Sequence, residues 1–119
     1  KELPDAFLRR CVFHYIEFPE PDLMEDIVRV HFPNIKGNLL GEALKTFYSL
    51  RQIDDFRKKP STSELIDWIR ALIAGGVSLD SISSEIPYIG TLLKKETDHT
   101  FFINRYMTRI GDKYVVRRR

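Results

Sequence analysis

The chain has 119 residues, of which 43% are hydrophobic and 30% are charged, and this length predicts a single folded domain. A chain of this size and composition can bury a sizeable core, which excludes disordered and collagen-like classes. Nineteen Lys and Arg residues stand against seventeen Asp and Glu residues, and the charges are interspersed except at residues 117–119. Because this pattern requires no large basic face, we expect no nucleic-acid partner.

The cysteine content and the hydropathy pattern predict a cytoplasmic protein without a membrane partner. Cys11 is the one cysteine, so an internal disulfide is excluded, and no Cys or His spacing typical of zinc is present. The longest uncharged run, residues 71–79, is far shorter than the roughly 20 apolar residues of a membrane span. No targeting segment is visible. Since the chain opens on Lys1 and not on methionine, we expect it to be part of a longer protein.

The start of the chain predicts a short helix followed by one strand. Residues 6–10 favour one or two helical turns that end in Arg9 and Arg10, where basic side chains suit the negative end of the helix dipole. Residues 11–18 are rich in β-branched and aromatic residues, which is typical of a short buried strand. One strand cannot form a sheet. Its partner is either the segment 114–116 or, as we prefer, a sheet upstream of this chain.

The next part of the chain changes to helical periodicity. Asp22 and Glu25 have the spacing of a capping box, and apolar residues recur at helical spacing after them until Pro33. A second apolar stripe predicts a helix over 39–53. A charged connector, residues 54–60, follows it.

A third helix is predicted from a stronger signal. Ser61 and Glu64 again have capping-box spacing ahead of an apolar stripe, and Gly75 and Gly76 end that stripe. Weaker stripes predict two short helices, one over 78–86 and one that starts at Pro87.

The chain is expected to end in one more helix and a tail. The last helix is predicted over 98–109, and beyond Gly111 we expect a polar, frayed tail. The predicted fold is therefore mainly α: a helical bundle preceded by a short helix and by one strand detached from its parent α/β sheet.

The residues themselves show no complete catalytic constellation. The glycines are scattered, so neither type of glycine-rich phosphate loop is present. The histidines, His14, His31 and His99, lie on different predicted elements without a metal-like spacing. Cys11 opens a hydrophobic strand, where an inert buried thiol is expected in preference to a nucleophile. We therefore expect no catalysis by this chain alone.

Several runs of residues resemble one family. The run LPDAFLRRCVFH, residues 3–14, resembles the stretch of AAA+ ATPases in which a short helix ends in arginine and leads into the last strand of the nucleotide-binding sheet. Residues 18–33, the run KPSTSEL with Asp67 and Trp68, and the segment 86–94 are similar to the MoxR-type branch of these ATPases. The resemblance extends over nearly the whole chain.

The resemblance implies a division of the chain into three parts. Residues 1–18 would be the end of the nucleotide-binding α/β subdomain, and residues 19–109 would be the helical lid domain. Residues 110–119 would be a polar basic tail. This division accounts for the predicted strand that has no partner.

The resemblance also implies an arginine finger. Members of the family hydrolyse ATP in homo-oligomeric rings, for which six subunits are expected, and each subunit contributes an arginine to the γ-phosphate in the neighbouring subunit. Such a guanidinium offsets the charge that spreads over the phosphoryl oxygens in the transition state. Arg10, directly before Cys11, is the implied finger, and Arg9 is the reserve candidate. From the residues alone, the favoured interpretation of both arginines is that they complement the helix dipole.

The family's lid usually adds a second positive group near the start of the helix that here begins at Ser61. Ser63 stands where that arginine is expected, so only Lys58 and Lys59 bring a positive charge to this place. A lysine offers a point charge without the bidentate geometry of arginine. The alternatives are that both lysines are solvated and that Ser61 caps a helix.

The cofactors and partners follow from the same resemblance. The longer protein would bind ATP and Mg²⁺ through motifs upstream of this chain, whereas the chain alone would bind no cofactor. The implied activity is chaperone-like remodelling of a protein client. A non-enzymatic helical protein-interaction module is the alternative, with the aromatic residues in its core or in a groove. DNA binding by the helix at 61–74 is disfavoured because Glu64 and Asp67 lie on it.

Overall fold

The computed structural model describes residues 18–117 of the chain. The predicted helix over 6–10 lies outside the described residues, and so does nearly all of the predicted strand over 11–18. The described elements are α2 (Pro21–His31), α3 (Gly37–Arg51), α4 (Thr62–Gly75), α5 (Leu79–Glu85), α6 (Ile89–Leu92), α7 (Glu96–Tyr106), β1 (Met107–Ile110) and β2 (Lys113–Val116).

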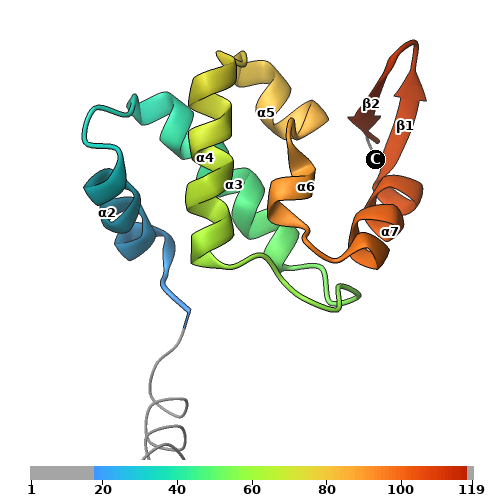
Figure 1. The fold of residues 1–119 in the computed structure, drawn as a ribbon, viewed down its shortest axis with the longest axis horizontal. Helices are drawn as coiled ribbons and strands as arrows, with labels where there is room; N and C mark the ends of the chain where they lie inside the picture. Colours follow the sequence, from blue (N-terminus) through green and yellow to red (C-terminus); the bar gives the residue numbers. More distant parts are fainter. Residues whose placement is uncertain (1–17, 118–119) are drawn as a thin grey trace, which may run out of the picture.

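Helices α3 and α4 form the centre of the molecule, with α2 on one side and α7 with the two strands on the other (Figure 1). α3 packs against α5, α4 packs against α6, and β2 lies against α5. The core lies between these helices, because each of them carries an apolar stripe that only a neighbouring helix can cover. Its largest fully buried side chains include Trp68, Phe47, Met24, Leu40, Leu65, Ile69 and Leu72. The prediction of a mainly helical fold is confirmed.

The two predicted capping boxes have different outcomes. In α4, the Ser61 hydroxyl accepts a hydrogen bond from the Glu64 amide at 3.4 Å, and the Glu64 carboxylate accepts one from the Ser61 amide at 2.9 Å. In α2, the helix begins at Pro21 with Glu20 as its N-cap, so the box predicted at Asp22 and Glu25 is wrong. Proline starts this helix two residues earlier than that box implies, because its fixed φ suits the first helical position.

The end of α4 is set by glycine, as predicted. Gly76 is the C-cap and has a φ of 60°, in the left-handed region that glycine adopts without steric cost. The helix predicted over 39–53 is found as α3, which begins two residues earlier and ends two residues earlier.

The chain end differs most from the prediction. α7 ends at Tyr106, three residues before the predicted end, and the next residues form β1. β1 pairs antiparallel with β2, with Thr108 opposite Val115 and Ile110 opposite Lys113. A hairpin therefore replaces the frayed tail that was expected beyond Gly111. The segment 114–116 does form a strand, and its described partner is β1.

Side-chain contacts hold this hairpin against the helices. The Arg117 guanidinium donates to the carbonyls of Asn104 and Arg105, at 3.1 and 2.9 Å, and these carbonyls lie in the last turn of α7. Lys113 forms an ion pair with Glu85 of α5, with 2.9 Å between Nζ and Oε2. The hairpin is thus tied both to the helix that precedes it and to the bundle.

The turn between α5 and α6 has an unusual backbone. Ile86 and Tyr88 have φ values of 47° and 59°, a region that residues with a Cβ rarely adopt. Each such residue costs on the order of 1–3 kcal/mol and persists only where its surroundings hold it. Pro87 lies between them, and its carbonyl accepts a hydrogen bond of 2.6 Å from the indole N–H of Trp68. The buried tryptophan therefore fastens this turn to α4.

Candidate functional site

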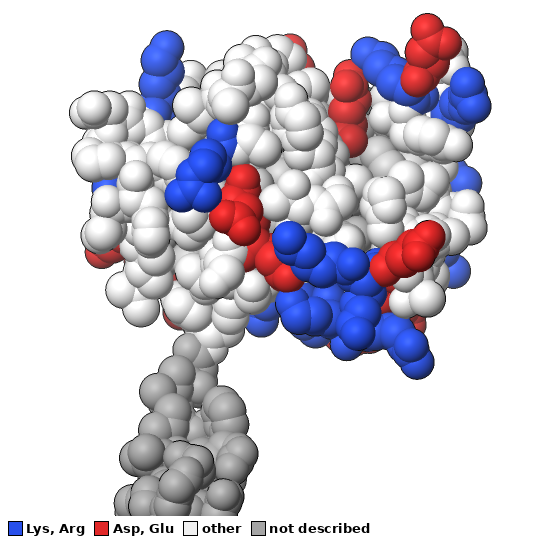
Figure 2. All heavy atoms as spheres, in the orientation of Figure 1, with Lys and Arg blue, Asp and Glu red and all other residues white. Residues whose placement is uncertain are grey.

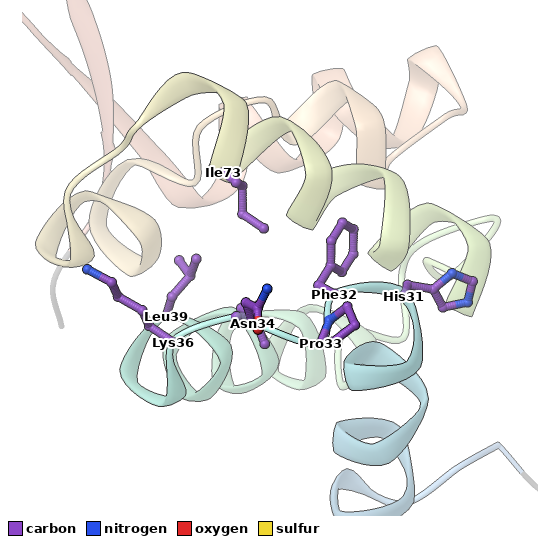
Figure 3. Close-up of a pocket in the computed structure, with 8 residues that line it drawn as sticks. His31, Phe32, Pro33, Asn34, Lys36, Leu39 and Ile73 are labelled. Atoms are coloured by element: carbon purple, nitrogen blue, oxygen red, sulfur yellow. The ribbon is translucent and has the colours of Figure 1, made fainter.

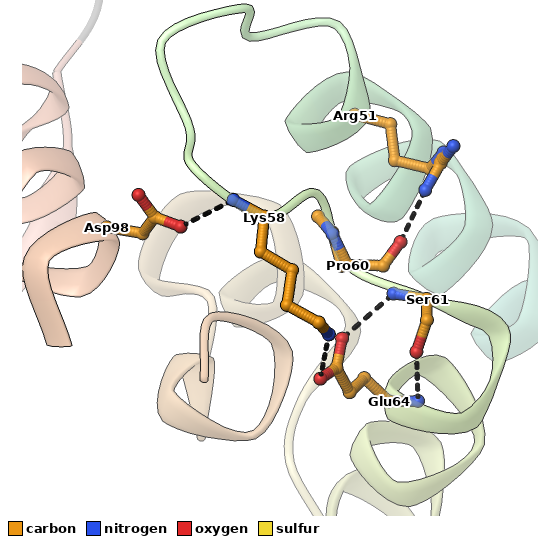
Figure 4. Close-up of polar contacts among 6 residues, drawn as sticks. All are labelled: Arg51, Lys58, Pro60, Ser61, Glu64 and Asp98. Atoms are coloured by element: carbon orange, nitrogen blue, oxygen red, sulfur yellow. Dashed lines mark hydrogen bonds and ion pairs between the residues drawn. The ribbon is translucent and has the colours of Figure 1, made fainter. Parts of the chain in front are cut away.

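The α3–α4 connector, residues 52–61, carries Lys58 and Lys59, the two lysines that the sequence singled out. Figure 4 shows the contacts of Lys58. Lys58 Nζ lies 2.8 Å from Glu64 Oε2 in the first turn of α4. The ion pair crosses from the connector to α4 next to the capping box. Lys58 is thus bound to the start of the helix and is not a free loop lysine.

The Glu64 carboxylate is the more buried charge of this pair, because its side chain is 9% exposed and that of Lys58 is 46% exposed. Burial by itself raises the pKa of Glu64. The hydrogen bonds from Lys58 and from the Ser61 amide, together with the positive charge of Lys58, outweigh burial and hold the pKa below its ordinary value. The ionised form is therefore the one that the folded chain stabilises.

We expect the Glu64→Gln variant to lose the pH dependence that this pair contributes. Because the folded-state pKa of Glu64 is lowered, its contribution is full above the unfolded-state pKa of about 4.3 and disappears as the pH falls through the folded value. Glutamine still accepts the hydrogen bond from the Ser61 amide. Urea unfolding should therefore show wild type more stable by roughly 1 kcal/mol at pH 7, with the gap closing toward pH 3. A gap that does not change with pH, or an equal change in the α3 control Glu42→Gln, contradicts this assignment.

The Lys59 ammonium lies at the carboxyl end of α3. Its Nζ donates to the carbonyls of Arg51 and Ile53 at 2.8 and 2.9 Å, and it lies 3.6 Å from Asp54 Oδ1. A cation is favoured here because the last carbonyls of a helix have no partner within it. Two of the three ammonium donors are therefore held by backbone, and the third faces an aspartate side chain that is 97% exposed.

Asp98, in the first turn of α7, fastens the connector from the other side. It is 2% exposed, and its carboxylate accepts hydrogen bonds from the backbone amides of Arg57 and Lys58 at 2.8 and 3.0 Å. Next to these bonds, Phe56 packs against Phe101 and Phe102 of the same helix. The sequence interpretation treated Asp98 only as a helix start, since nothing in the sequence pairs it with residues about 40 positions earlier.

Arg51 joins the connector to the point where the chain enters the bundle. Its guanidinium lies 3.4 Å from the ring centroid of Phe18, and it donates a hydrogen bond to the Pro60 carbonyl. The Tyr48 hydroxyl donates to the Pro19 carbonyl at 2.6 Å. Burial lowers the pKa of Arg51, although a guanidinium stays charged in proteins. We call the contacts of Arg51 with Phe18 and Pro60 the Arg51 clamp. The sequence did not reveal it, because an arginine at the end of a helix carries no distinguishing signal.

The other predicted site residues are placed as follows. Arg9 and Arg10 lie outside the described residues. Ser63 is exposed in the first turn of α4, and Ser61 is the N-cap. The structure brings Lys58 and Ser61 together at the Glu64 carboxylate in the first turn of α4, whereas the Lys59 ammonium lies at the carboxyl end of α3.

Basic side chains are concentrated at this end of the molecule. Figure 2 shows Lys and Arg gathered over the connector and over the segment between α6 and α7. Arg57 and Lys58 of the connector are exposed, and so are Lys94 and Lys95 just before α7. The hydrogen bonds from the connector to Asp98 bring the two basic pairs close to each other. This surface suits an anionic group.

Further features of the described residues, together with comparisons with known proteins, leave the function open. No helix between residues 18 and 117 combines the length and the apolar character needed to cross a membrane. Within the same residues, no group of His, Cys, Asp and Glu side chains has the arrangement of a metal site. The chain matches no model of a protein family, no curated protein and no solved structure.

Proposed function

We propose that this chain is the C-terminal lid part of a cytoplasmic, MoxR-like AAA+ ATPase. In this proposal the longer protein forms a homo-oligomeric ring, hydrolyses ATP with Mg²⁺ and uses lid movement to remodel a protein client. The observation that supports it best is the Arg51 clamp. One guanidinium contacts both Phe18, at the entry of the chain, and Pro60, next to the two connector lysines.

The clamp suits a unit that transmits movement. Asp98 ties the connector to α7, and Arg51 ties it to Phe18, so a shift of the connector would act on both of these contacts. Arg10 stands eight positions before Phe18 in the sequence. A rotation of the helical unit would thus move the segment that carries the proposed finger, which is how lid closure would be coupled to hydrolysis.

Lys59 is better suited than Lys58 to meet a phosphate. Its ammonium is already oriented by two carbonyls, and its third donor faces the exposed Asp54, which a phosphate oxygen can displace. Lys58 pairs with the enclosed carboxylate of Glu64, whose negative charge would repel a phosphate nearby. Ser63 offers only a neutral hydroxyl. The proposal therefore assigns the lid's positive group to Lys59, with Lys58 as the secondary candidate.

The proposal predicts that nucleotide binding needs the upstream part of the longer protein. The 119-residue chain should not bind a fluorescent ATP analogue at micromolar concentration, because the phosphate loop and the magnesium ligands would lie upstream. The longer protein should bind the same analogue in the presence of Mg²⁺. Fluorescence anisotropy with both proteins at equal concentration measures this difference. Micromolar binding by the chain alone, or no binding by the longer protein, contradicts the proposal.

A further inference from the structure

A groove lies between the turn that joins α2 to α3 and the carboxyl-terminal part of α4 (Figure 3). Its volume is about 460 Å³, which is in the range of pockets that take small ligands or single side chains. We call it the α2–α4 groove. Its lining consists of His31, Phe32, Pro33, Asn34, Ile35, Lys36, Leu39 and Ile73.

Apolar side chains dominate this lining and remain accessible. Ile73 of α4 is 44% exposed, and Phe32 and Leu39 are only partly covered by the core. Figure 3 shows Ile73 pointing from α4 toward the side where Leu39 and Phe32 rise from the opposite wall. Exposed apolar side chains around a concave surface are typical of an interaction site, because a partner gains free energy by covering them.

The one formally charged side chain in the groove lining is positive. It belongs to Lys36, and no carboxylate lines the groove. Lys36 is also the N-cap of α3, a helix with no acidic residue in its first turn and no side-chain cap, so the positive end of its dipole lies at the groove. Arg29 adds a guanidinium that donates to the Ile35 carbonyl at 3.4 Å. By contrast, the groove between α3, α5 and α7 includes Asp54 and Asp55.

We infer that the α2–α4 groove binds a short segment of a separate protein that combines a bulky apolar side chain with one or more carboxylates. The apolar side chain would lie between Ile73 and Leu39, and the carboxylates would meet Lys36 and the first amides of α3. Acidic residues are favoured by charge complementarity, which raises the association rate and the specificity. Since the chain itself has a net charge of +2, a separate acidic segment is favoured over a second copy.

A selection from a random library of displayed 12-residue peptides tests this inference on the 119-residue chain. The enriched peptides should combine Leu, Ile or Phe with Asp or Glu. The Lys36→Glu variant should bind the best peptide at least tenfold more weakly and should prefer its Lys-substituted counterpart. Ile73→Asp should also abolish binding, whereas the control Tyr114→Asp, on the hairpin, should bind like wild type. Because Lys36 is exposed, the Lys36→Glu variant should fold normally. It therefore tests the groove even if Ile73→Asp destabilises the fold.

Three results overturn the inference. Enriched peptides without an acidic bias would remove the charge argument, and binding that survives Lys36→Glu unchanged would place the contact elsewhere. Sedimentation that shows self-association, lost in the Lys36→Glu and Ile73→Asp variants alone, would assign the groove to a second copy. None of these readouts involves ATP, so the outcome is independent of the proposed function.

Discussion

Replacing Arg10 by alanine in the longer protein should reduce ATP turnover about a hundredfold or more, with little change in ATP affinity. In the proposed ring, the guanidinium meets charge that develops on the γ-phosphoryl oxygens mainly in the transition state. An interaction of this kind lowers kcat and leaves ground-state binding nearly unchanged. Steady-state hydrolysis and anisotropy of an ATP analogue, measured on the same preparations, separate these two quantities.

The controls for this experiment distinguish a finger from a structural charge. Arg29→Ala removes a half-buried arginine that contacts Glu25, at 3.7 Å, and the Ile35 carbonyl, at 3.4 Å, and it should leave turnover unchanged. If Arg10→Ala is silent and Arg9→Ala is not, the finger role moves to Arg9. If both variants turn over ATP like wild type, the two arginines are helix-end charges and the finger assignment fails.

Replacing Trp68 by alanine should have the largest effect on folding, a loss of about 3–5 kcal/mol in the free energy of unfolding. Trp68 is fully buried and is the largest side chain of the core. Its removal leaves a cavity, and it also leaves the Pro87 carbonyl without the indole donor. Because this bond fastens the turn with two positive-φ residues, we expect α6 to lose its position on α4. Urea unfolding followed by circular dichroism measures the loss.

The Trp68→Phe variant separates the hydrogen bond from packing. Phenylalanine fills much of the indole volume but donates no hydrogen bond, so the loss should be smaller, about 1–3 kcal/mol. Adding Tyr88→Gly to this variant should then recover part of the loss, because glycine adopts a φ of 59° without steric cost. Equal losses for Trp68→Ala and Trp68→Phe would mean that the hydrogen bond, and not the packing, carries the effect.

The helices could be predicted because their signals are local. Each of the long helices carries an apolar stripe, and the box at Ser61 and Glu64 places the start of α4 correctly. The α2 start was misplaced by two residues because Pro21 and the acidic pair after it are both typical of a first turn. Local rules therefore identify an element better than they fix its boundary.

The hairpin could not be predicted in the same way. Phe101, Phe102 and Tyr106 continue a helical stripe up to Met107, and no proline or glycine marks the end of α7. The hairpin turns at Gly111 and Asp112, and Gly111 has a φ of 64°, which suits the first position of a tight hairpin turn, but the sequence interpretation took Gly111 only as the start of a polar tail. The hairpin is stabilised by the pairing of β1 with β2 and by the contact of β2 with α5. A helical pattern in the sequence reveals neither of these contacts.

The candidate site was predictable only in part. Lys58, Lys59 and Ser61 are neighbours in sequence, so the sequence alone places them in the same connector. Asp98 and Phe18 reach the same place from distant positions, because tertiary packing brings α7 and the chain entry to the connector. These contacts depend on a long-range arrangement, which composition and spacing do not encode.

ATP turnover by the longer protein, measured over a range of protein concentrations, tests the central claim most directly. The proposed ring places each finger in a neighbouring subunit, so turnover per subunit should rise with concentration and reach a plateau once rings have formed. The 119-residue chain by itself should not hydrolyse ATP at any concentration. Absence of ATP hydrolysis at every concentration would contradict the assignment of this chain to an ATPase lid.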